Sequence, residues 1–542
     1  MSIVARGVAK RFGDVPLFEN VNLELGEGEK VALLGANGSG KSTLLRLLAG
    51  LDKPDAGSVT ASGVALLAQT AAFGEGTVLE AVTPEMLRGA RRAFEKAQTD
   101  LADPTEAHLE AFARAEEHYR ACGGYDFEVR AAEVLAGLGL RPEWRARTLS
   151  GGQGRRASLA ALLLSPQSVL LLDEPTNHLD AASIGWLEGW VRASKSAALI
   201  VSHDRAFLDA TAARVYELER GELHSYPGNY SAAMQVKQAL RAGQERQYMA
   251  QERRKRALAQ EVGHLRSKGE SAGRFSHKRA GNQPLIMAKN KAEAASNTYA
   301  RRSAAMEKRL EQMPTVEKPF EDRARAQVPL PDVPTGPGEV LRVQDLTLAR
   351  GGKTLFEHLS FTLRRGEKLA LTGPNGGGKS SLIAAVLGQL SPQQGTVTLG
   401  HKLGVYWAGQ HGEELANFGT LEDAIQGAQP VLRTQDLFYL LSQLGLPPRP
   451  DFPVSQLSGG QRTRLSLARL AVTRAALLIL DEPTNHLDVR AVEALETLLA
   501  DYPGTLLFAS HDRRLIAQVA TRTLTLDKLV LDEGAMPQQG QQ

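Results

Sequence analysis

The sequence predicts an α/β protein in which two phosphate-loop domains stand in tandem, joined by a long antiparallel helical hairpin. The first observation is a repeat: Leu149–Asp180 returns as Leu457–Asp488, with 20 of 32 aligned positions identical and no gap. The second is a G-x-x-x-x-G-K-S motif that is present in each half. The third is a basic, helix-favouring segment between the two halves. Each motif follows an apolar strand and opens a helix, which is the context of an α/β domain.

The chain length agrees with this organisation, because 542 residues suffice for two or three domains with separate cores. We expect the first domain at 1–230, with a helical insertion at about 84–124. The linker is expected at 231–335, the second domain at 336–532 and a disordered tail at 533–542.

Composition excludes several classes of protein. No apolar run approaches the roughly 20 residues that cross a bilayer, and the first residues lack the apolar core of a signal peptide. A cytoplasmic location is therefore expected. The one cysteine, Cys122, excludes an internal disulfide and a cysteine-rich zinc or iron–sulfur site.

The two glycine-rich motifs predict ATP and Mg²⁺ as ligands. Gly35–Ser42 follows the strand Lys30–Leu34, and Gly373–Ser380 is its second copy. Glycines let backbone amides turn toward a phosphate, and the following helix adds its partial positive charge. The lysine is expected on the β- and γ-phosphates and the serine on Mg²⁺. The expected contacts are Gly35, Asn37, Gly38, Gly40, Lys41, Ser42 and Thr43, and Gly373, Asn375, Gly376, Gly378, Lys379, Ser380 and Ser381.

The repeated stretch contains a buried strand that ends in two carboxylates. Val169–Leu172 and Leu477–Leu480 are continuously apolar, as expected for a parallel strand covered on both faces. Each delivers an Asp-Glu pair to the carboxyl end of a sheet, where α/β proteins bind ligands. A structural strand could end in two acids once, but two copies in the same context favour a functional interpretation. A later strand in each half precedes Ser-His-Asp, at 202–204 and 510–512.

LSGGQ followed by an apolar run that ends in DE resembles the ATP-binding cassette (ABC) ATPases. The resemblance implies two composite sites, each pairing the phosphate loop of one cassette with the signature of the other. It implies that Glu174 and Glu482 activate water and that His203 and His511 contact the γ-phosphate. It implies metal contacts from Ser42, Gln69, Asp173, Ser380, Gln410 and Asp481. It implies that site one takes Ser458, Gly459, Gly460 and Gln461, and that site two takes Ser150, Gly151, Gly152 and Gln153.

One position differs between the halves. Phe12 lies where an aromatic side chain stacks on adenine in this class, but the aligned residue in the second half is Arg350. A guanidinium also stacks on rings, so we expect a working second site with different properties.

The first half has about 30 extra residues between its phosphate loop and its signature. Their pattern predicts two amphipathic helices, about Pro84–Asp100 and Thr105–Ala121, with a break at Asp103–Pro104. A tolerated surface insertion is the alternative interpretation. His108 and His118 are expected to be solvated rather than metal ligands, since no partner ligands lie at suitable spacing.

The segment between the cassettes is strongly basic. Residues 231–313 contain 18 Lys and Arg against seven Asp and Glu, whereas the whole chain carries only +3. Helices are expected at about Ser231–Arg266 and Leu285–Met313, joined by a glycine-rich tip and packed as a coiled coil. A solvated spacer is the alternative, but the clustered charge favours RNA contact. The expected contacts are Arg274, Lys278 and Arg279.

Two cassettes on one chain, a charged helical linker and DEPTNHLD in both halves resemble the ABC-F family. The resemblance implies a monomeric ATPase that binds the ribosome in its ATP-bound state, with the linker contacting rRNA and tRNA. Family members regulate translation or protect ribosomes from antibiotics. This chain departs from the family in its short insertion, in lacking the carboxy-terminal coiled coil of some members, and in a tip that matches no subgroup motif.

Other tandem-cassette proteins fit less well. The ribosome-recycling and excision-repair relatives carry metal-binding cysteines, which this chain lacks. A dual-cassette importer ATPase with a membrane partner is the alternative, although it does not need a basic hairpin. A non-hydrolysing scaffold is disfavoured, because both halves keep the lysine, the acidic pair and the histidine.

Overall fold

The computed structural model describes the chain except for residues 1, 68–72, 104, 275–284, 314–332, 334–335, 351–352, 402, 410–414, 416, 429–432, 444, 486 and 527–542. The chain divides into two compact units. One contains both cassettes, Met1–Ala233 and Arg323–Gln542, and the other is the linker, Met234–Asp322.

The first cassette is built on a mainly parallel sheet with the strand order β5-β6-β7-β3-β8-β9 among its described residues. The phosphate-loop strand β3 lies next to β7, and β7 lies next to β6, the strand that ends in the acidic pair. The carboxyl ends of these three strands therefore meet at one edge. A smaller antiparallel sheet, β2-β1-β4, packs its apolar face into the same core.

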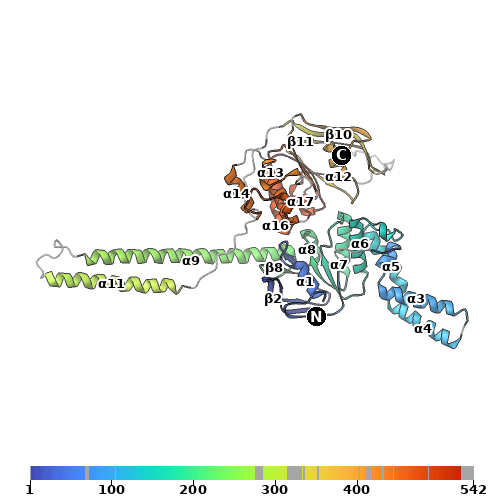
Figure 1. Cartoon of the computed structure of the whole chain (residues 1–542), viewed down its shortest axis with the longest axis horizontal. Helices are drawn as coiled ribbons and strands as arrows, with labels where there is room; N and C mark the ends of the chain where they lie inside the picture. The colour runs from blue at the N-terminus through green and yellow to red at the C-terminus, as the bar shows by residue number, and fades with distance from the viewer. Residues whose placement is uncertain are drawn as a thin grey trace, which may run out of the picture. The chain divides into compact units, whose positions relative to one another are not determined.

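The elements of the first cassette occur in this order along the chain (Figure 1): β1 Ile3–Phe12, β2 Val15–Leu25, β3 Lys30–Gly35, α1 Lys41–Leu48, β4 Ala56–Ala61, β5 Val64–Leu66, α2 Val78–Val82, α3 Glu85–Asp100, α4 Glu106–Ala121, α5 Gly124–Gly137, α6 Gly151–Leu163, β6 Val169–Asp173, α7 Ala181–Ala193, β7 Ala197–Val201, α8 Arg205–Thr211, β8 Arg214–Glu219 and β9 Glu222–Pro227.

The second cassette repeats this plan. Its parallel sheet has the order β14-β15-β16-β12-β17 over the part that the structure describes, with β11-β10-β13 as the smaller sheet. Its elements are β10 Glu339–Arg350, β11 Lys353–Arg364, β12 Lys368–Thr372, α12 Lys379–Val386, β13 Gln394–Leu399, β14 Val405–Ala408, α13 Leu421–Gln426, α14 Thr434–Gln443, α15 Gly459–Val472, β15 Leu477–Asp481, α16 Val489–Asp501, β16 Thr505–Ala509, α17 Arg513–Val519 and β17 Arg522–Thr525.

Burial explains why the central strands are continuously apolar. Every residue of β6, β7, β15 and β16 is buried, as expected for parallel strands covered on both faces. The predicted α/β class with two phosphate-loop cassettes is confirmed.

The insertion forms two helices that pack side by side, α3 and α4 (Figure 1). Thr105 caps α4 through the amide of His108, and α4 ends at Ala121, close to the predicted ends. An aromatic cluster joins the two helices: the rings of Phe94 and Tyr119 stack at 5.2 Å, and Phe112 lies 5.4 Å from Phe94. His108 Nδ1 contacts the carbonyl of Asp103, so this histidine caps a local turn.

The linker contains two long helices, α9 Tyr230–Gly273 and α11 Leu285–Glu311, which lie side by side in an antiparallel hairpin (Figure 1). Arg266 of α9 forms an ion pair with Glu307 of α11. The first helix continues seven residues beyond the predicted end at Arg266. At Gly269 a Cβ would lie 3.3 Å from the Cβ of Tyr299, so the glycine in this extension lets the two helices approach closely.

None of the helices in the described part of the chain combines the length and the hydropathy that a membrane span requires.

Candidate nucleotide sites and the cassette interface

Each phosphate loop has a backbone shape that requires glycine. In the first cassette Gly35 and Gly40 have φ of 157° and 102°. A Cβ at Gly35 would meet the carbonyl oxygen of Leu218 at 2.7 Å, and one at Gly40 would meet Leu17 at 2.8 Å. The loop is therefore a tight cradle at the start of α1, as the binding of a phosphate group requires.

The loop lysine of each cassette is buried and bonded to its own loop. Lys41 Nζ donates to the carbonyls of Gly35 and Ala36 at 2.8 and 3.0 Å. Lys379 makes the corresponding bonds at 3.0 and 3.2 Å. Burial lowers the pKa of Lys41, while Glu174, Asp488 and Asp173 oppose that shift. A buried ammonium held over backbone carbonyls can reorganise toward an anionic phosphate.

The glutamate after each central strand has an unusual backbone. Glu174 and Glu482 have φ of 52° and 49°, in the left-handed region that non-glycine residues seldom occupy. Their amides donate to the carbonyls of Val201 and Ala509 at 2.8 and 2.9 Å, which extends the pairing with the neighbouring strand by one residue. Strained conformations of this kind cluster at functional sites.

Each glutamate faces the histidine of the next strand. His203 Nε2 lies 3.1 Å from Glu174 Oε1, and His511 Nε2 lies 3.3 Å from Glu482 Oε1. Burial, reinforced by Asp173, raises the pKa of Glu174 to about 8. Burial raises the pKa of Glu482 to about 7.

Burial together with the loop lysines lowers the pKa of both histidines, His203 and His511, to about 4. Each site therefore contains a neutral imidazole beside a buried carboxyl and a buried ammonium.

The signature residues form helix N-termini. Ser150 caps α6 and exchanges hydrogen bonds with Gln153 in a capping box, and Ser458 does the same with Gln461 at α15. Free backbone amides at such an end attract anions. Arg155 of α6 donates to the carbonyl of Asp173 at 3.1 Å, which ties the signature helix to the end of the acidic strand.

The cassettes contact each other through the last residue of each DEPTNHLD motif. Asp180 caps α7 with one oxygen, and its other oxygen accepts from the amide of Asn375 in the second phosphate loop at 3.3 Å. Asp488 caps α16 and accepts from the amide of Asn37 at 3.5 Å. Each phosphate loop is thus held by an aspartate of the opposite cassette.

A second pair of contacts joins the cassettes behind the sites. Arg205 of α8 forms a buried ion pair with Glu496 of α16. Its equivalent 308 residues later, Arg513 of α17, lies 3.2 Å from Glu188 of α7. The two pairs are related by the internal repeat, but the first is more buried.

A cavity of about 1,690 Å³ is shared by the two cassettes. Its lining brings the first signature, at Ser150, Gly152 and Gln153, together with the second phosphate loop. Lys41, Glu174, His203, Glu482 and His511 also line it. The described lining does not include Ser458 or Gln461, the signature residues expected at site one.

The residue at the predicted base platform differs between the halves. Phe12 and Arg350 both end the first strand of their small sheet, opposite Val15 and Lys353 respectively, and both line the cavity. The Phe12 side chain is 63% exposed. An exposed apolar ring at the edge of a cavity suits stacking against a flat base.

The donor set fits Mg²⁺ that is bound together with phosphates. No cluster of three His, Cys, Asp or Glu able to hold a metal occurs among the described residues. Ser42 and Asp173 line the cavity beside Lys41. Mg²⁺ takes one or two protein oxygens and completes its shell with water and substrate phosphates. Of the other predicted ligands, Gln69 and Gln410 lie outside the described residues.

Three of these contacts, made by Asp180, Asp488 and Arg155, were not predicted from sequence. Asp180 and Asp488 were part of the repeated motif, and their recurrence at equivalent positions was the available signal. Arg155 gave no signal, because the second half has Thr463 at the aligned position.

Among the predicted RNA contacts, Arg274 is exposed directly after α9, while Lys278 and Arg279 lie outside the described residues.

These loops, acidic strands and signature helices define an ABC-type ATPase with two cassettes on one chain. The family model described as ABC transporter matches residues 18–177 and 356–485, and a second model with the same description matches 216–328. The chain is 36% identical to the ATP-binding protein Uup of Escherichia coli, over 96% of this chain and 80% of that protein. It is 32% identical to the energy-dependent translational throttle protein EttA of Escherichia coli, over 94% and 89%.

An Arabidopsis thaliana protein, ABC transporter F family member 5, is 32% identical over 97% of this chain and 75% of its own length. The chain belongs to the ABC-F family. The archaeal ribosome recycling factor aABCE1, solved with a stalk protein, shares the fold with a TM-score of 0.58 at 19% identity, over 96% of this chain and 87% of that one.

Proposed function

We propose that this ABC-F ATPase binds the ribosome in its ATP-bound state and uses hydrolysis to leave it, with the basic linker contacting rRNA or tRNA. Its role is to modulate translation or to protect ribosomes from antibiotics, and its place is the cytoplasm. A relative is named as a translational throttle protein, and the linker supplies the physical argument.

The observation that carries the proposal is the exposed charge of the linker helices. The cationic side chains that are exposed on the described part of α9, on α11 and just after α9 are Arg246, Arg253, Arg254, Arg256, Arg266, Lys268, Arg274, Lys291, Arg301, Arg302, Lys308 and Arg309. Val262 of α9 and Ser303 of α11 are buried. The exposed cationic side chains give the described part of the hairpin a cationic outer surface, which suits binding to RNA phosphates.

Hydrolysis is proposed to need the residues gathered in the cavity together with Asp481, which precedes Glu482 at the end of β15. In this proposal Glu174 and Glu482 orient and deprotonate water, and His203 and His511 beside them contact the γ-phosphate. Ser42, Asp173, Ser380 and Asp481 would hold Mg²⁺, which supplies charge neutralisation at the phosphates. Phosphoryl transfer depends mainly on such positioning and charge, so closure of the cassettes assembles the catalyst.

The test combines trapping with salt dependence. Glu174→Gln with Glu482→Gln should hold ATP without hydrolysing it and should co-sediment with ribosomes when ATP is present. Alanine at Arg274, Lys278 and Arg279 in that background should weaken binding. It should also lower the slope of log affinity against log salt by up to about 3, roughly one unit for each lost phosphate contact.

A control variant removes three exposed arginines of the second cassette, Arg365, Arg433 and Arg474. It changes the net charge equally but should keep the wild-type slope. Equal effects of the two triple variants would contradict a linker-specific contact. Recovery of the trapped protein in the membrane pellet, with none on ribosomes, would contradict the ribosomal role.

A further inference from the structure

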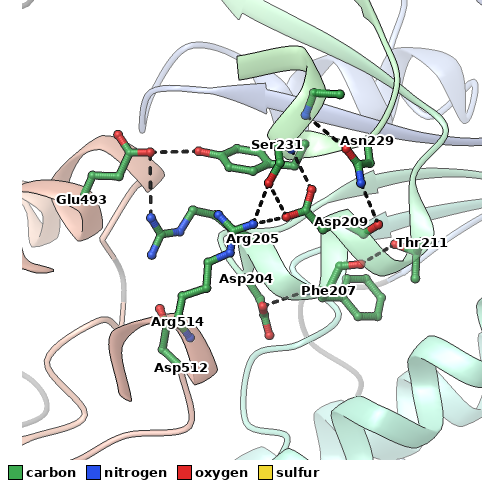
Figure 2. A network of polar contacts seen from close by, with 12 residues as sticks. Asp204, Arg205, Phe207, Asp209, Thr211, Asn229, Ser231, Glu493, Asp512 and Arg514 are labelled. Atoms are coloured by element: carbon green, nitrogen blue, oxygen red, sulfur yellow. Dashed lines mark hydrogen bonds and ion pairs between the residues drawn. The ribbon is translucent and has the colours of Figure 1, made fainter. Parts of the chain in front are cut away.

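Among the described residues, one side of the cassette interface carries a layer of contacts that the equivalent positions on the other side lack. Arg514, next to Arg513 in α17, forms an ion pair with Asp209 of α8 and donates to Ser231 Oγ at 2.8 Å (Figure 2). The residues 308 positions away are Ala206 for Arg514 and Ala517 for Asp209. Two alanines cannot form this ion pair, so the layer breaks the internal symmetry.

The contacts end on the first turn of the linker helix α9. Asp209 accepts from the amide of Ser231 and from its hydroxyl, both at 2.7 Å. Asn229 accepts from the amide of Ala232 at 3.1 Å, which caps the helix. One carboxylate therefore holds both the start of α9 and an arginine of the second cassette (Figure 2).

Tyr230 adds a second connection at the same turn. Its side chain is buried, and its hydroxyl donates to Glu493 Oε1 of α16 at 3.1 Å. The guanidinium of Arg514 lies 5.4 Å from the centre of the Tyr230 ring. The position equivalent to Glu493 in the first cassette is Gly185, which has no side chain to accept this bond.

The layer lies one helical turn from a nucleotide site. Arg514 follows His511 by three residues, and Asp512 between them caps α17 by accepting from the amides of Arg514 and Leu515 at 2.9 and 3.0 Å. A short capped helix thus connects the histidine of site two to the joint. In the first cassette α8 follows His203 in the same way, but Ala206 takes the place of Arg514.

We propose that the joint formed by Arg514, Asp209 and Ser231 couples the nucleotide state of site two, more strongly than that of site one, to the start of the linker helix. Arg514 lies three residues after His511, whereas Asp209 lies six residues after His203. The inference rests on the proposed ATP-driven cycle. The inference adds to that cycle the nucleotide site and the residues that transmit a change of nucleotide state to the linker. Because α9 is one continuous helix from Tyr230 to Gly273, a change in how its first turn is held acts on the whole helix.

The experiment measures amide hydrogen exchange of residues 230–240 with and without ATP, in the absence of ribosomes. Glu482→Gln traps ATP in site two, and Glu174→Gln traps it in site one. In Glu482→Gln, ATP should slow exchange by about 5- to 150-fold, the range that typical coupling energies give. Glu174→Gln should show less than half of that effect on a logarithmic scale.

Adding Arg514→Ala to Glu482→Gln should abolish the ATP-dependent difference, and Arg514→Lys should restore part of it. Arg513→Ala is the matched control, because Arg513 pairs with Glu188 and should leave the difference intact. A merely structural role would speed exchange equally with and without ATP. That result would overturn the coupling.

Two further results would also overturn the inference: an unchanged ATP-dependent difference in Arg514→Ala, or equal differences in the two trapped variants. Since ribosomes are absent from this measurement, failure of ribosome binding leaves its outcome unaffected. If a variant loses the exchange response but still co-sediments with ribosomes, the first result supports the coupling through the joint. The second result independently supports the proposed function.

Discussion

The buried ion pair between Arg205 and Glu496 gives the sharpest test of how the cassettes are held together. Both side chains are 4% exposed, whereas in the equivalent pair Arg513 and Glu188 are 38% and 15% exposed. The perturbation is Arg205→Met, which removes the cation and keeps most of the volume. The matched change at the other pair is Arg513→Met.

The expected losses of stability differ because the two ion pairs differ in their exposure to water. Removal of one partner from a buried pair leaves an uncompensated charge and costs about 3–5 kcal/mol. Arg513 is more than a third exposed, so its removal from that partly solvated pair should cost closer to the value of about 0.2–1 kcal/mol for exposed pairs. Arg205→Met should therefore destabilise the protein by about 3 kcal/mol more than Arg513→Met. The double change Arg205→Met with Glu496→Leu should recover most of the loss, because no charge then remains buried.

The pH dependence follows from Glu496. Burial raises the pKa of this carboxyl, and Arg205 is the main group that opposes the rise. Without Arg205 the pKa rises further, so the buried carboxyl is destabilising at pH 7 and becomes neutral as the pH falls. The difference in stability between Arg205→Met and wild type should therefore shrink between about pH 7 and pH 5.

The assay is urea unfolding of wild type, the single variants and the double variant, followed by tryptophan fluorescence. Three of the four tryptophans, Trp144, Trp186 and Trp190, lie in the first cassette, and Trp407 lies in the second. The coupling energy comes from the double-mutant cycle. Equal losses at the two equivalent pairs, or no recovery in the double variant, would refute the argument from burial.

Three further outcomes are expected. Glu174→Gln with Glu482→Gln should lower the ATPase rate by about 10²- to 10⁴-fold while retaining ATP, because a positioned base is lost; phosphate release near the wild-type rate would contradict the assignment. Asp180→Ser should keep the cap of α7 and Asp180→Ala should lose about 1 kcal/mol of stability, while both lower ATPase activity through the lost contact to the opposite phosphate loop; thermal melts beside ATPase rates would show whether the two effects separate. Phe12→Ala should weaken ATP binding at site one by about 1–3 kcal/mol, the value of base stacking on an aromatic ring, and Arg350→Ala should cost less at site two; fluorescent-ATP titrations of the two variants would contradict unequal sites if the losses match.

Much of the fold and of the site could be predicted from the sequence, because these features depend on local chemistry. The phosphate loops are recognisable because only glycine tolerates the backbone seen at Gly35 and Gly40. The central strands are recognisable because full burial on both faces demands continuous apolar residues. The insertion helices were predicted from their amphipathic pattern and from the break at Asp103–Pro104. Each of these features depends on residues close together in the chain.

Features that depend on contacts between segments far apart in the sequence were visible only in the tertiary structure. The left-handed backbone of Glu174 and Glu482, the second oxygen of Asp180 on the opposite phosphate loop, and the extension of α9 past Arg266 all require a partner that the local pattern does not contain. Arg514 is the clearest example of a contact that the sequence does not predict. The sequence contains it as one more arginine after a histidine motif, and its contact with Asp209 arises only because two homologous cassettes pair so that α8 and α17 touch beside the first turn of α9. The internal repeat predicts two similar cassettes from the sequence alone. Only the packing of the cassettes against each other shows which differences between them change the contacts at the interface.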